Sequence, residues 1–333
     1  MRIQAAILGG GSWGTTVASL VARNVPATLW ARAPETVDEI NTKHSNERYL
    51  PGARLTPGLR ATSSIEEAVR GADVVIMGVP SQAMRETVRV VGKHIRAWVP
   101  VISLSKGFEL GTKLRMTQII EAELPGHPAG VLSGPNLARE VMSGFAAASV
   151  IAMEDEVIVQ ELQAIFKSGL FRVYTNTDVA GCELGGALKN VMAIATGMGD
   201  GAGAGENTRS AVISRALNEI TRLGIAMGGR AETFAGLAGV GDLIATCTSP
   251  QSRNRTVGFE LGKGRKIADI LAGMRQVAEG VKSAKTVLLL GEEHGVEMPI
   301  ACEVNGVINE GRNAQEAFRG LLRRAAGAEA DPG

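Results

Sequence analysis

The sequence predicts an α/β protein in which an N-terminal, doubly wound parallel sheet is followed by an all-helical C-terminal domain. Three observations lead to this fold class. Short β-rich runs alternate with helical stretches in the first half of the chain, which is typical of a parallel sheet with helices on both faces. After about residue 180 the strand-like runs stop and helical spacing remains. The length of 333 residues suits two domains, which we expect to span residues 1–178 and 179–333.

The expected strands are short apolar runs without polar alternation, as suits strands that are buried on both faces. They span residues 3–8, 27–30, 73–79, 99–104 and 130–132. The helical segments between them span residues 15–24, 35–42, 64–70, 82–92 and 113–123. In the third helix Ser64 is suited to the N-cap, and Glu66 and Glu67 fall in the first turn, where the helix dipole favours acids.

The second half of the chain has the spacing of amphipathic helices. We expect helices at residues 178–199, 208–223, 232–237, 267–273, 283–294 and 300–310. In the second of these the apolar residues fall on one stripe, formed by Val212, Ile213, Ala216, Leu217, Ile220 and Leu223. The Ala-rich tail, residues 325–333, is expected to fray.

Composition excludes several classes of function. The 35 Lys and Arg residues balance 34 Asp and Glu residues, so the net charge of +1 gives no global attraction to nucleic acid or to an anionic membrane. No segment approaches the roughly 20 uninterrupted apolar residues of a membrane helix, and we find no signal peptide. The cysteines, Cys182, Cys247 and Cys302, are odd in number and far apart, which argues against a disulfide framework or a zinc ribbon. We therefore expect a cytoplasmic protein without a metal.

The turn after the first strand carries the clearest local motif. Gly9, Gly11 and Gly14 fit the pattern G-x-G-x-x-G, with a strand ending at Leu8 and a helix opening near Ser12. In dinucleotide-binding folds the first glycine permits a tight turn, the second lets the backbone approach the pyrophosphate, and the third lets the helix pack on the strand. The motif predicts a Rossmann-type domain; the alternative is a purely structural strand-to-helix turn.

The end of the second strand bears on which dinucleotide is bound. An NAD-selective site usually offers Asp or Glu there to the ribose diol. This chain has Ala31 and Arg32, and its first acid is Glu35. Arg32 could pair with a 2′-phosphate, so NADP is favoured over NAD; the alternative is a solvated loop cation.

Polar loops also follow the later strands, where ligands bind in open α/β sheets. Lys106 lies in one such loop and could reach inward to an anion, although its position suits an exposed lysine equally well. The loop 133–136 contains Gly134 and Pro135, and the proline is suited to the first turn of a helix.

Lys189 is the most informative single residue. Its neighbours at three and four residues along the expected helix are Gly185, Gly186, Met192 and Ala193, so it has no intrahelical acid partner. A lysine in such a crevice loses hydration, its pKa tends to fall, and it becomes a competent proton donor or acceptor near neutral pH. The alternative is a lysine that extends from a packed helix to water.

Residues 239–258 form an expected loop of unusual charge. Asp242 is the only acid between Glu232 and Glu260, and Arg253 and Arg255 follow it. An arginine-containing, acid-poor loop suits a phosphate or a carboxylate; the alternative is a solvated interdomain loop. Asp242 could orient a lysine ammonium or could cap a helix.

Taken together, these motifs resemble one family, the bacterial NAD(P)-dependent glycerol-3-phosphate dehydrogenases, over nearly the whole chain. The resemblance rests on residues 9–14 with Trp13, 79–81, 105–107, 132–135, 171–174, 183–190, 198–201, 239–243, 246–248, 251–255, 277–280 and 296–300. It implies reversible hydride transfer between the nicotinamide and carbon 2 of sn-glycerol 3-phosphate, giving dihydroxyacetone phosphate. It also implies a homodimer and a role in glycerophospholipid synthesis.

The resemblance implies roles for individual residues, with Lys189 as the proton donor or acceptor. The implied substrate contacts are Lys106, Gly134, Asn136, Lys189, Asp242, Ser252, Arg253 and Asn254. The implied cofactor contacts are Gly9, Gly11, Ser12, Trp13, Gly14, Arg32, Lys106, Ala138, Arg253, Val277 and Glu279.

Two departures from the family pattern leave points open. Asn136 stands where many members have Ser or Thr, so its hydrogen-bonding role is open, and the sequence at Ala31-Arg32 varies enough in the family to leave the choice of NAD or NADP open. Two other functions are considered. A β-hydroxyacid dehydrogenase would share the two-domain plan and a catalytic lysine, and a non-catalytic dinucleotide sensor would share the fold alone.

Overall fold

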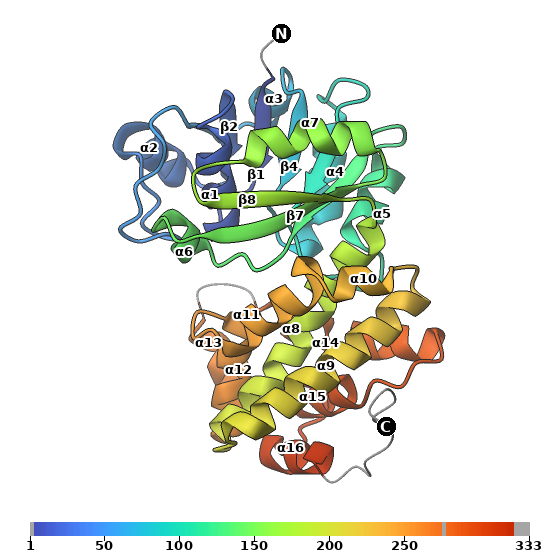
Figure 1. The fold of residues 1–333 in the computed structure, drawn as a ribbon. Helices are drawn as coiled ribbons and strands as arrows, with labels where there is room; N and C mark the ends of the chain where they lie inside the picture. The colour runs from blue at the N-terminus through green and yellow to red at the C-terminus, as the bar shows by residue number, and fades with distance from the viewer. Residues whose placement is uncertain (1–2, 275–277, 323–333) are drawn as a thin grey trace. The chain divides into compact units, whose positions relative to one another are not determined.

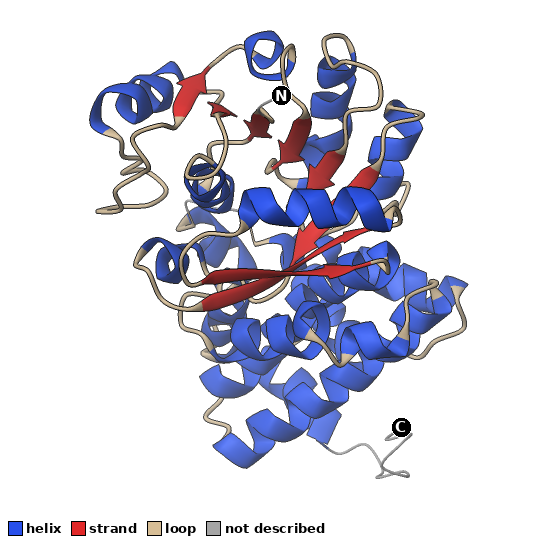
Figure 2. Ribbon diagram, turned by 45° about the horizontal axis from the view of Figure 1, so that its top comes forward, coloured by secondary structure: helices blue, strands red, loops and turns tan. Residues whose placement is uncertain are grey.

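The computed structural model describes residues 3–274 and 278–322, which form parts of two compact units (Figure 1). The first, termed the sheet unit, comprises Met1–Glu109 and Leu114–Glu183. The second, termed the helical unit, comprises Leu110–Lys113 and Leu184–Gly333. In the described ranges all strands belong to the sheet unit (Figure 2).

The sheet has eight strands within the described residues, in the order β3-β2-β1-β4-β5-β6-β7-β8. Neighbouring strands are parallel except for β6 and β7, so β7 and β8 run opposite to the other six. The chain reverses its direction of progress through the sheet at β1, which pairs with β2 on one side and β4 on the other. Their bounds are β1 Ala5–Leu8, β2 Ala27–Trp30, β3 Arg60–Thr62, β4 Val74–Met77, β5 Val101–Ser103, β6 Ala129–Ser133, β7 Ala147–Met153 and β8 Phe171–Asn176.

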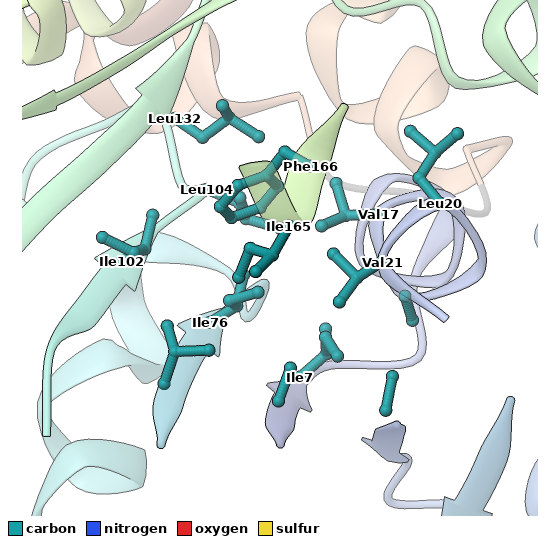
Figure 3. Close-up of a cluster of buried hydrophobic side chains, with 14 of the residues drawn as sticks. Ile7, Val17, Leu20, Val21, Ile76, Ile102, Leu104, Leu132, Ile165 and Phe166 are labelled. Carbon is teal, nitrogen blue, oxygen red and sulfur yellow. The ribbon is translucent and has the colours of Figure 1, made fainter. Parts of the chain in front are cut away.

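Helices cover both faces of this sheet, and each face has its own apolar core. Because successive side chains of a strand point to opposite faces, Ile7 and Ile76 enter one core (Figure 3) while Leu8 and Met77 enter the other. The first core packs against α1, α6 and α7, and the second against α3, α4 and α5. The helices of this unit are α1 Ser12–Val21, α2 Pro34–Lys43, α3 Ile65–Val69, the short helix η1 Ser81–Ala83, α4 Met84–Gly92, α5 Met116–Glu123, α6 Ala138–Met142 and α7 Glu156–Phe166.

The helical unit is built around α8 (Val179–Gly201), which begins in the sheet unit and continues into this one. From Leu184 to Gly199 every residue of α8 is buried. The other helices are α9 Glu206–Ala226, α10 Ala231–Phe234, the wide turn η2 Leu237–Gly241, α11 Asp242–Thr248, α12 Arg253–Gly262, α13 Ile267–Ala272, α14 Glu279–Glu293, α15 Pro299–Asn309 and α16 Ala314–Leu322.

Glycines let α8 and α12 approach until their backbones touch. A Cβ added to Gly258 of α12 would lie 2.0 Å from the carbonyl oxygen of Ile194, and one added to Gly262 would lie 2.3 Å from that of Met198. The reciprocal contact exists on α8, where a Cβ on Gly201 would lie 2.1 Å from the carbonyl oxygen of Phe259. This crossing therefore leaves no room for side chains and fixes the spacing of the two helices.

The fold class predicted from the sequence is confirmed, and each of the five expected strands is present. Three further strands were missed. β3 is only three residues long, and β8 alternates buried with exposed residues, so neither has the continuous apolar run that was sought. β7 does contain such a run, residues 150–153, behind a start of small residues, and it was overlooked. The segment 239–258, expected to be a loop, is mostly helical in α11 and α12.

The tail 325–333 lies outside the described residues. Within the described ranges, none of the helices combines the length and the apolar character that a bilayer crossing demands.

Replacing Gly258 with alanine tests the helix crossing. The added methyl group cannot be accommodated against backbone, so we expect the free energy of unfolding to fall by about 1–3 kcal/mol. The matched control is Gly320→Ala on α16, where an added Cβ has no atom within 4 Å. The control should be stabilised by up to about 1 kcal/mol, because alanine is the better helix former. Urea unfolding followed by circular dichroism measures the stability of both variants. Equal midpoints for the two would show that the crossing of α8 and α12 tolerates a side chain at position 258.

Candidate active site

Two glycines of the turn after β1 are required by its geometry. Gly9 has a φ of 129°, a conformation open to glycine, and a Cβ there would lie 2.5 Å from the carbonyl oxygen of Gly78. A Cβ on Gly14 would lie 2.1 Å from the carbonyl oxygen of Gly9. Backbone bonds from Gly9 N to Trp30 O (3.0 Å) and from Gly78 N to Leu8 O (2.7 Å) seat the turn between β2 and β4. The loop therefore lies where the strand order reverses, which is the usual ligand position in such sheets.

Gly11 differs from these two glycines because it faces open space. A Cβ added to it would have no atom within 4 Å. Gly11 is also the N-cap of α1, which has no side-chain cap and no acid in its first turn. An uncapped helix N-terminus beside open space suits a phosphate group. These features fit the pyrophosphate of a dinucleotide.

Other expected cofactor residues of the sheet unit lie on α1, in the link after β2 and on α6. Ser12 and Trp13 open α1, and the Trp13 ring meets Phe171 edge-on at 6.3 Å between centroids. The Trp13 Nε1 donor is buried with no hydrogen-bond partner within the described part of the chain. Arg32 is exposed in the link between β2 and α2, and Ala138 opens α6.

Polar groups gather at the ends of β5 and β6. Lys106 Nζ donates to the carbonyl oxygen of Gly134 at 2.7 Å, so these two expected substrate residues are in contact. Asn136 Oδ1 accepts from the Ser149 hydroxyl of β7. Asn136 Nδ2 and Ser133 Oγ are buried without a partner among the described residues. Buried polar atoms of this kind call for a ligand or water.

In the helical unit, Lys189 lies at the centre of a buried polar cluster. Its Nζ is 3.1 Å from Asp242 Oδ1, with only 6% and 3% of the two side chains exposed. Nζ also donates to Thr246 Oγ1 at 2.6 Å and to Asn190 Oδ1 at 3.3 Å. The Thr246 hydroxyl donates in turn to Asp242 Oδ1 at 3.3 Å. The ammonium is thus held without bulk water by a carboxylate and two neutral acceptors, a setting suited to proton transfer.

A second layer of hydrogen bonds fixes this cluster. Asn254 Nδ2 donates to Asn190 Oδ1 at 2.9 Å, and the backbone N–H of Gly280 donates to Asn254 Oδ1 at 3.0 Å. Ser252 is the N-cap of α12, and its Oγ accepts from Arg255 N at 3.3 Å. Ser252 and Asn254 therefore also hold the start of α12 in place.

Sequence reasoning did not assign Asn190 or Thr246 to the site. Thr246 follows Asp242 by four residues, and that spacing would have placed both on one face of a helix if α11 had been expected. Asn190 directly follows Lys189 in α8. No local pattern indicates that its amide oxygen turns toward the lysine; Asn254 of α12 donates to the same oxygen and helps to orient it.

The two arginines of residues 251–255 differ in their surroundings. Arg255 is bound to Asp200, at 2.9 Å from Nε and 2.6 Å from Nη2. The Arg253 side chain is solvent-exposed, yet many protein atoms lie close to its guanidinium group and lower its pKa by desolvation. The negative charge of Glu279 acts in the opposite direction. Of the two, Arg253 is the better placed to meet an anionic ligand. Glu279 is the first residue of α14, and Val277 lies outside the described residues.

Cys247 lies behind the lysine cluster on α11. Burial raises the pKa of its thiol to about 11, opposed by a hydrogen bond with Thr196 and by the charge of Lys189. The thiol therefore stays protonated near neutral pH and is a poor nucleophile. The proton chemistry of this cluster falls to Lys189 and its partners.

Comparisons with known proteins identify the same family for the N-terminal and the C-terminal part of the chain. A family model of the N-terminus of NAD-dependent glycerol-3-phosphate dehydrogenase matches residues 4–159, and the model of its C-terminus matches residues 178–319. A protein of Sphingopyxis alaskensis named glycerol-3-phosphate dehydrogenase (NAD(P)+) 2 is 63% identical over 333 residues, covering 100% of each chain. One of Mycobacterium avium with the same activity in its name is 55% identical over 324 residues, covering 97% of this chain and 95% of the relative.

Solved structures give the same result. The crystal structure of glycerol-3-phosphate dehydrogenase from Coxiella burnetii has a TM-score of 0.93 and 36% identity, and the match covers 97% of this chain and 99% of that one. Sequence and fold therefore agree from one end of the chain to the other. The chain belongs to the NAD-dependent glycerol-3-phosphate dehydrogenase family.

Proposed function

We propose that this chain catalyses the reversible NAD(P)H-dependent reduction of dihydroxyacetone phosphate to sn-glycerol 3-phosphate, for glycerophospholipid synthesis. The observation that carries the mechanism is the buried Lys189 ammonium, held 3.1 Å from Asp242 and 2.6 Å from Thr246. A reduction of a ketone needs a proton at the carbonyl oxygen, and Lys189 is the proton donor in this direction and the acceptor in the other.

The dinucleotide supplies the hydride when bound. As hydride reaches carbon 2, the ketone oxygen takes a proton from Lys189 Nζ and becomes the alcohol. Lys189 is left as a neutral amine and must be reprotonated before the next turnover. Asp242 favours the charged ammonium before transfer, and Thr246 and Asn190 fix the direction in which Nζ points.

The substrate phosphate is assigned to Arg253, with Ser252 and Asn254 at the same helix N-terminus. Lys106, Gly134 and Asn136 supply further polar contacts to the substrate, and the unpartnered Asn136 Nδ2 is a suitable donor. Cofactor contacts are assigned to Gly9, Gly11, Ser12, Trp13, Gly14, Arg32, Lys106, Ala138, Arg253, Val277 and Glu279. In this proposal residues 1–178 provide most of the contacts to the dinucleotide, and residues 179–333 provide the catalytic lysine and most of the contacts to the substrate.

The alternative functions are not favoured. A β-hydroxyacid dehydrogenase would not explain why both family models of one other enzyme match. A non-catalytic sensor would leave the buried pair of Lys189 and Asp242 without a purpose, since a buried ion pair often contributes less to stability than apolar residues of similar volume would.

NADPH is the favoured cofactor in this proposal. Arg32 is an exposed cation just past the carboxyl end of β2, and the first acid after it is Glu35 in α2. A cationic side chain there suits the 2′-phosphate of NADP and offers nothing to the ribose diol of NAD. We further propose a cytoplasmic homodimer; the three cysteines of the sequence, which are odd in number and far apart, are in keeping with a reducing compartment.

Lys189→Ala should lower kcat for dihydroxyacetone phosphate reduction by at least about 10²–10⁴-fold, because the proton donor is lost. The dissociation constant for NADPH should stay nearly unchanged. NADPH oxidation with dihydroxyacetone phosphate and a panel of keto acids measures the first, and NADPH fluorescence the second. Lys285→Ala, on the exposed side of α14, is the control and should retain activity. Full turnover by Lys189→Ala would exclude Lys189 as the proton donor. A preference of the unmodified enzyme for keto acids would exclude dihydroxyacetone phosphate as its main substrate.

Arg32→Ala should raise KM for NADPH by about tenfold, because a charge-assisted bond to the 2′-phosphate is lost. KM for NADH should change little. Arg60→Ala, at the start of β3, is the matched exposed-arginine control. Equal changes in KM for both cofactors would refute the assignment of Arg32 to the 2′-phosphate.

Iodoacetamide at about pH 8 should label Cys302 in the native protein and leave Cys247 unmodified. With its pKa raised to about 11, only about one Cys247 thiol in a thousand is ionised at that pH, and the side chain is also buried. Mass spectrometry after proteolysis measures the labelling, and denatured protein labelled on all three cysteines is the control. Rapid native labelling of Cys247 would show that the cluster around Lys189 opens to solvent.

A further inference from the structure

We infer that Asn46 is a positioning residue for the dinucleotide loop, a role that rests on the proposed function for the identity of the ligand. Asn46 lies in the segment after α2 and is fully buried, with 0% of its surface exposed. Its Nδ2 donates to the carbonyl oxygen of Gly10 at 3.0 Å and to Thr15 Oγ1 at 2.9 Å. One amide therefore links the glycine turn to the first turn of α1.

The chemistry of the partners fixes how this amide is oriented. The Gly10 carbonyl can only accept a hydrogen bond, so it must face the NH₂ group of Asn46. The Oδ1 atom of Asn46 is then left buried without a partner among the described residues. A buried, unpaired acceptor is unfavourable, so packing alone does not explain an asparagine at this position. The two hydrogen bonds that the Asn46 NH₂ group donates, to Gly10 and to Thr15, explain why an asparagine occupies this position.

The bond to Gly10 determines where the next backbone donor points. No cis peptide is present in the described residues, and in a trans peptide the C=O and the following N–H point in opposite directions. The Gly10 carbonyl points at Asn46, so the N–H of Gly11 points away from Asn46. Gly11 is the N-cap residue whose added Cβ would meet nothing within 4 Å. The donor is thereby held ready for an anion.

Without Asn46 the Gly10 carbonyl would lose the hydrogen bond that fixes its direction, although Gly10 also packs against Ala31. Gly10 and Gly11 are both glycines, which have the weakest backbone preferences of all residues. A rotated Gly10–Gly11 peptide would present a carbonyl oxygen to the pyrophosphate in place of an N–H. Because Asn46 orients the Gly10–Gly11 peptide before the cofactor binds, it lowers the entropic cost of binding.

Asn46 is itself held by neighbouring bonds. Glu39 Oε1 of α2 accepts from the Ser45 hydroxyl at 2.8 Å and from Glu47 N at 2.7 Å, one residue on each side of Asn46. The Asn46 carbonyl accepts from Leu50 N at 2.8 Å. The segment is thus fixed before any ligand arrives.

The test compares Asn46→Leu, Thr15→Val and the double variant Thr15→Val/Asn46→Leu. Thr15→Val removes the second partner of Asn46 and leaves the bond to Gly10, so it is the matched control. The double variant replaces both side chains with apolar groups of similar shape, which keeps the packing if Asn46→Leu alone fails to fold. Dissociation constants are measured by NADPH fluorescence and by competition with adenosine 2′-monophosphate, which lacks the pyrophosphate. Melting temperatures without ligand report on folding.

We expect the NADPH dissociation constant to rise about tenfold in Asn46→Leu and in the double variant, and less than about twofold in Thr15→Val. Binding of adenosine 2′-monophosphate and kcat at saturating NADPH should be unchanged. Equal NADPH affinities in Thr15→Val and the double variant would overturn the inference, as would equal weakening of NADPH and adenosine 2′-monophosphate. Failure of the unmodified protein to bind either NADPH or NADH would instead overturn the proposed function, and this inference with it.

Discussion

The pairing of the Lys189 ammonium with Asp242 is the interaction on which the helical unit depends. A buried charge is tolerated only when it is paired and hydrogen-bonded, and removing either partner leaves the other uncompensated. The pair joins α8 to α11, and Asn190 and Asn254 join the same cluster to α12. The three helices must therefore pack at fixed distances for the cluster to form. The glycines at the crossing of α8 and α12 make those distances possible, since their backbones touch where side chains would separate them.

The same relation between glycine and a polar site holds in the sheet unit. Gly9 and Gly14 close the turn after β1, and Gly11 leaves it open on one side. The backbone N–H groups of this turn point in a fixed direction only while hydrogen bonds, such as the one from Asn46 to Gly10, hold the peptides. Thus the 42 glycines of the chain do not indicate a loose structure. At these positions they bring backbone against backbone, and neighbouring side chains supply the order that glycine lacks.

Local pattern was sufficient for much of this fold. The apolar runs at 3–8 and 73–79 identify central strands because those strands are buried on both faces, and the glycine motif identifies the turn between β1 and α1. Edge strands were harder to predict: β8 is half exposed, so it lacks such a run. Lys189 could be singled out because its helical neighbours are small and uncharged. The contact of Lys189 with Thr246 and that of Asn46 with Gly10 could not be found in this way, since each depends on segments brought together by folding. Asn190 is adjacent to Lys189, but the bond from Asn254 that helps to orient its amide comes from another helix.

The division of the chain between the two units has a consequence for synthesis on the ribosome. Residues 110–113 belong to the helical unit although the chain on both sides of them belongs to the sheet unit. Lys113 of this segment pairs with Glu293, which is made 180 residues later. The sheet unit can be completed once Glu183 has emerged, whereas the four residues 110–113 must wait for nearly the whole polypeptide. No single cut of the chain would yield the two units as separate intact fragments.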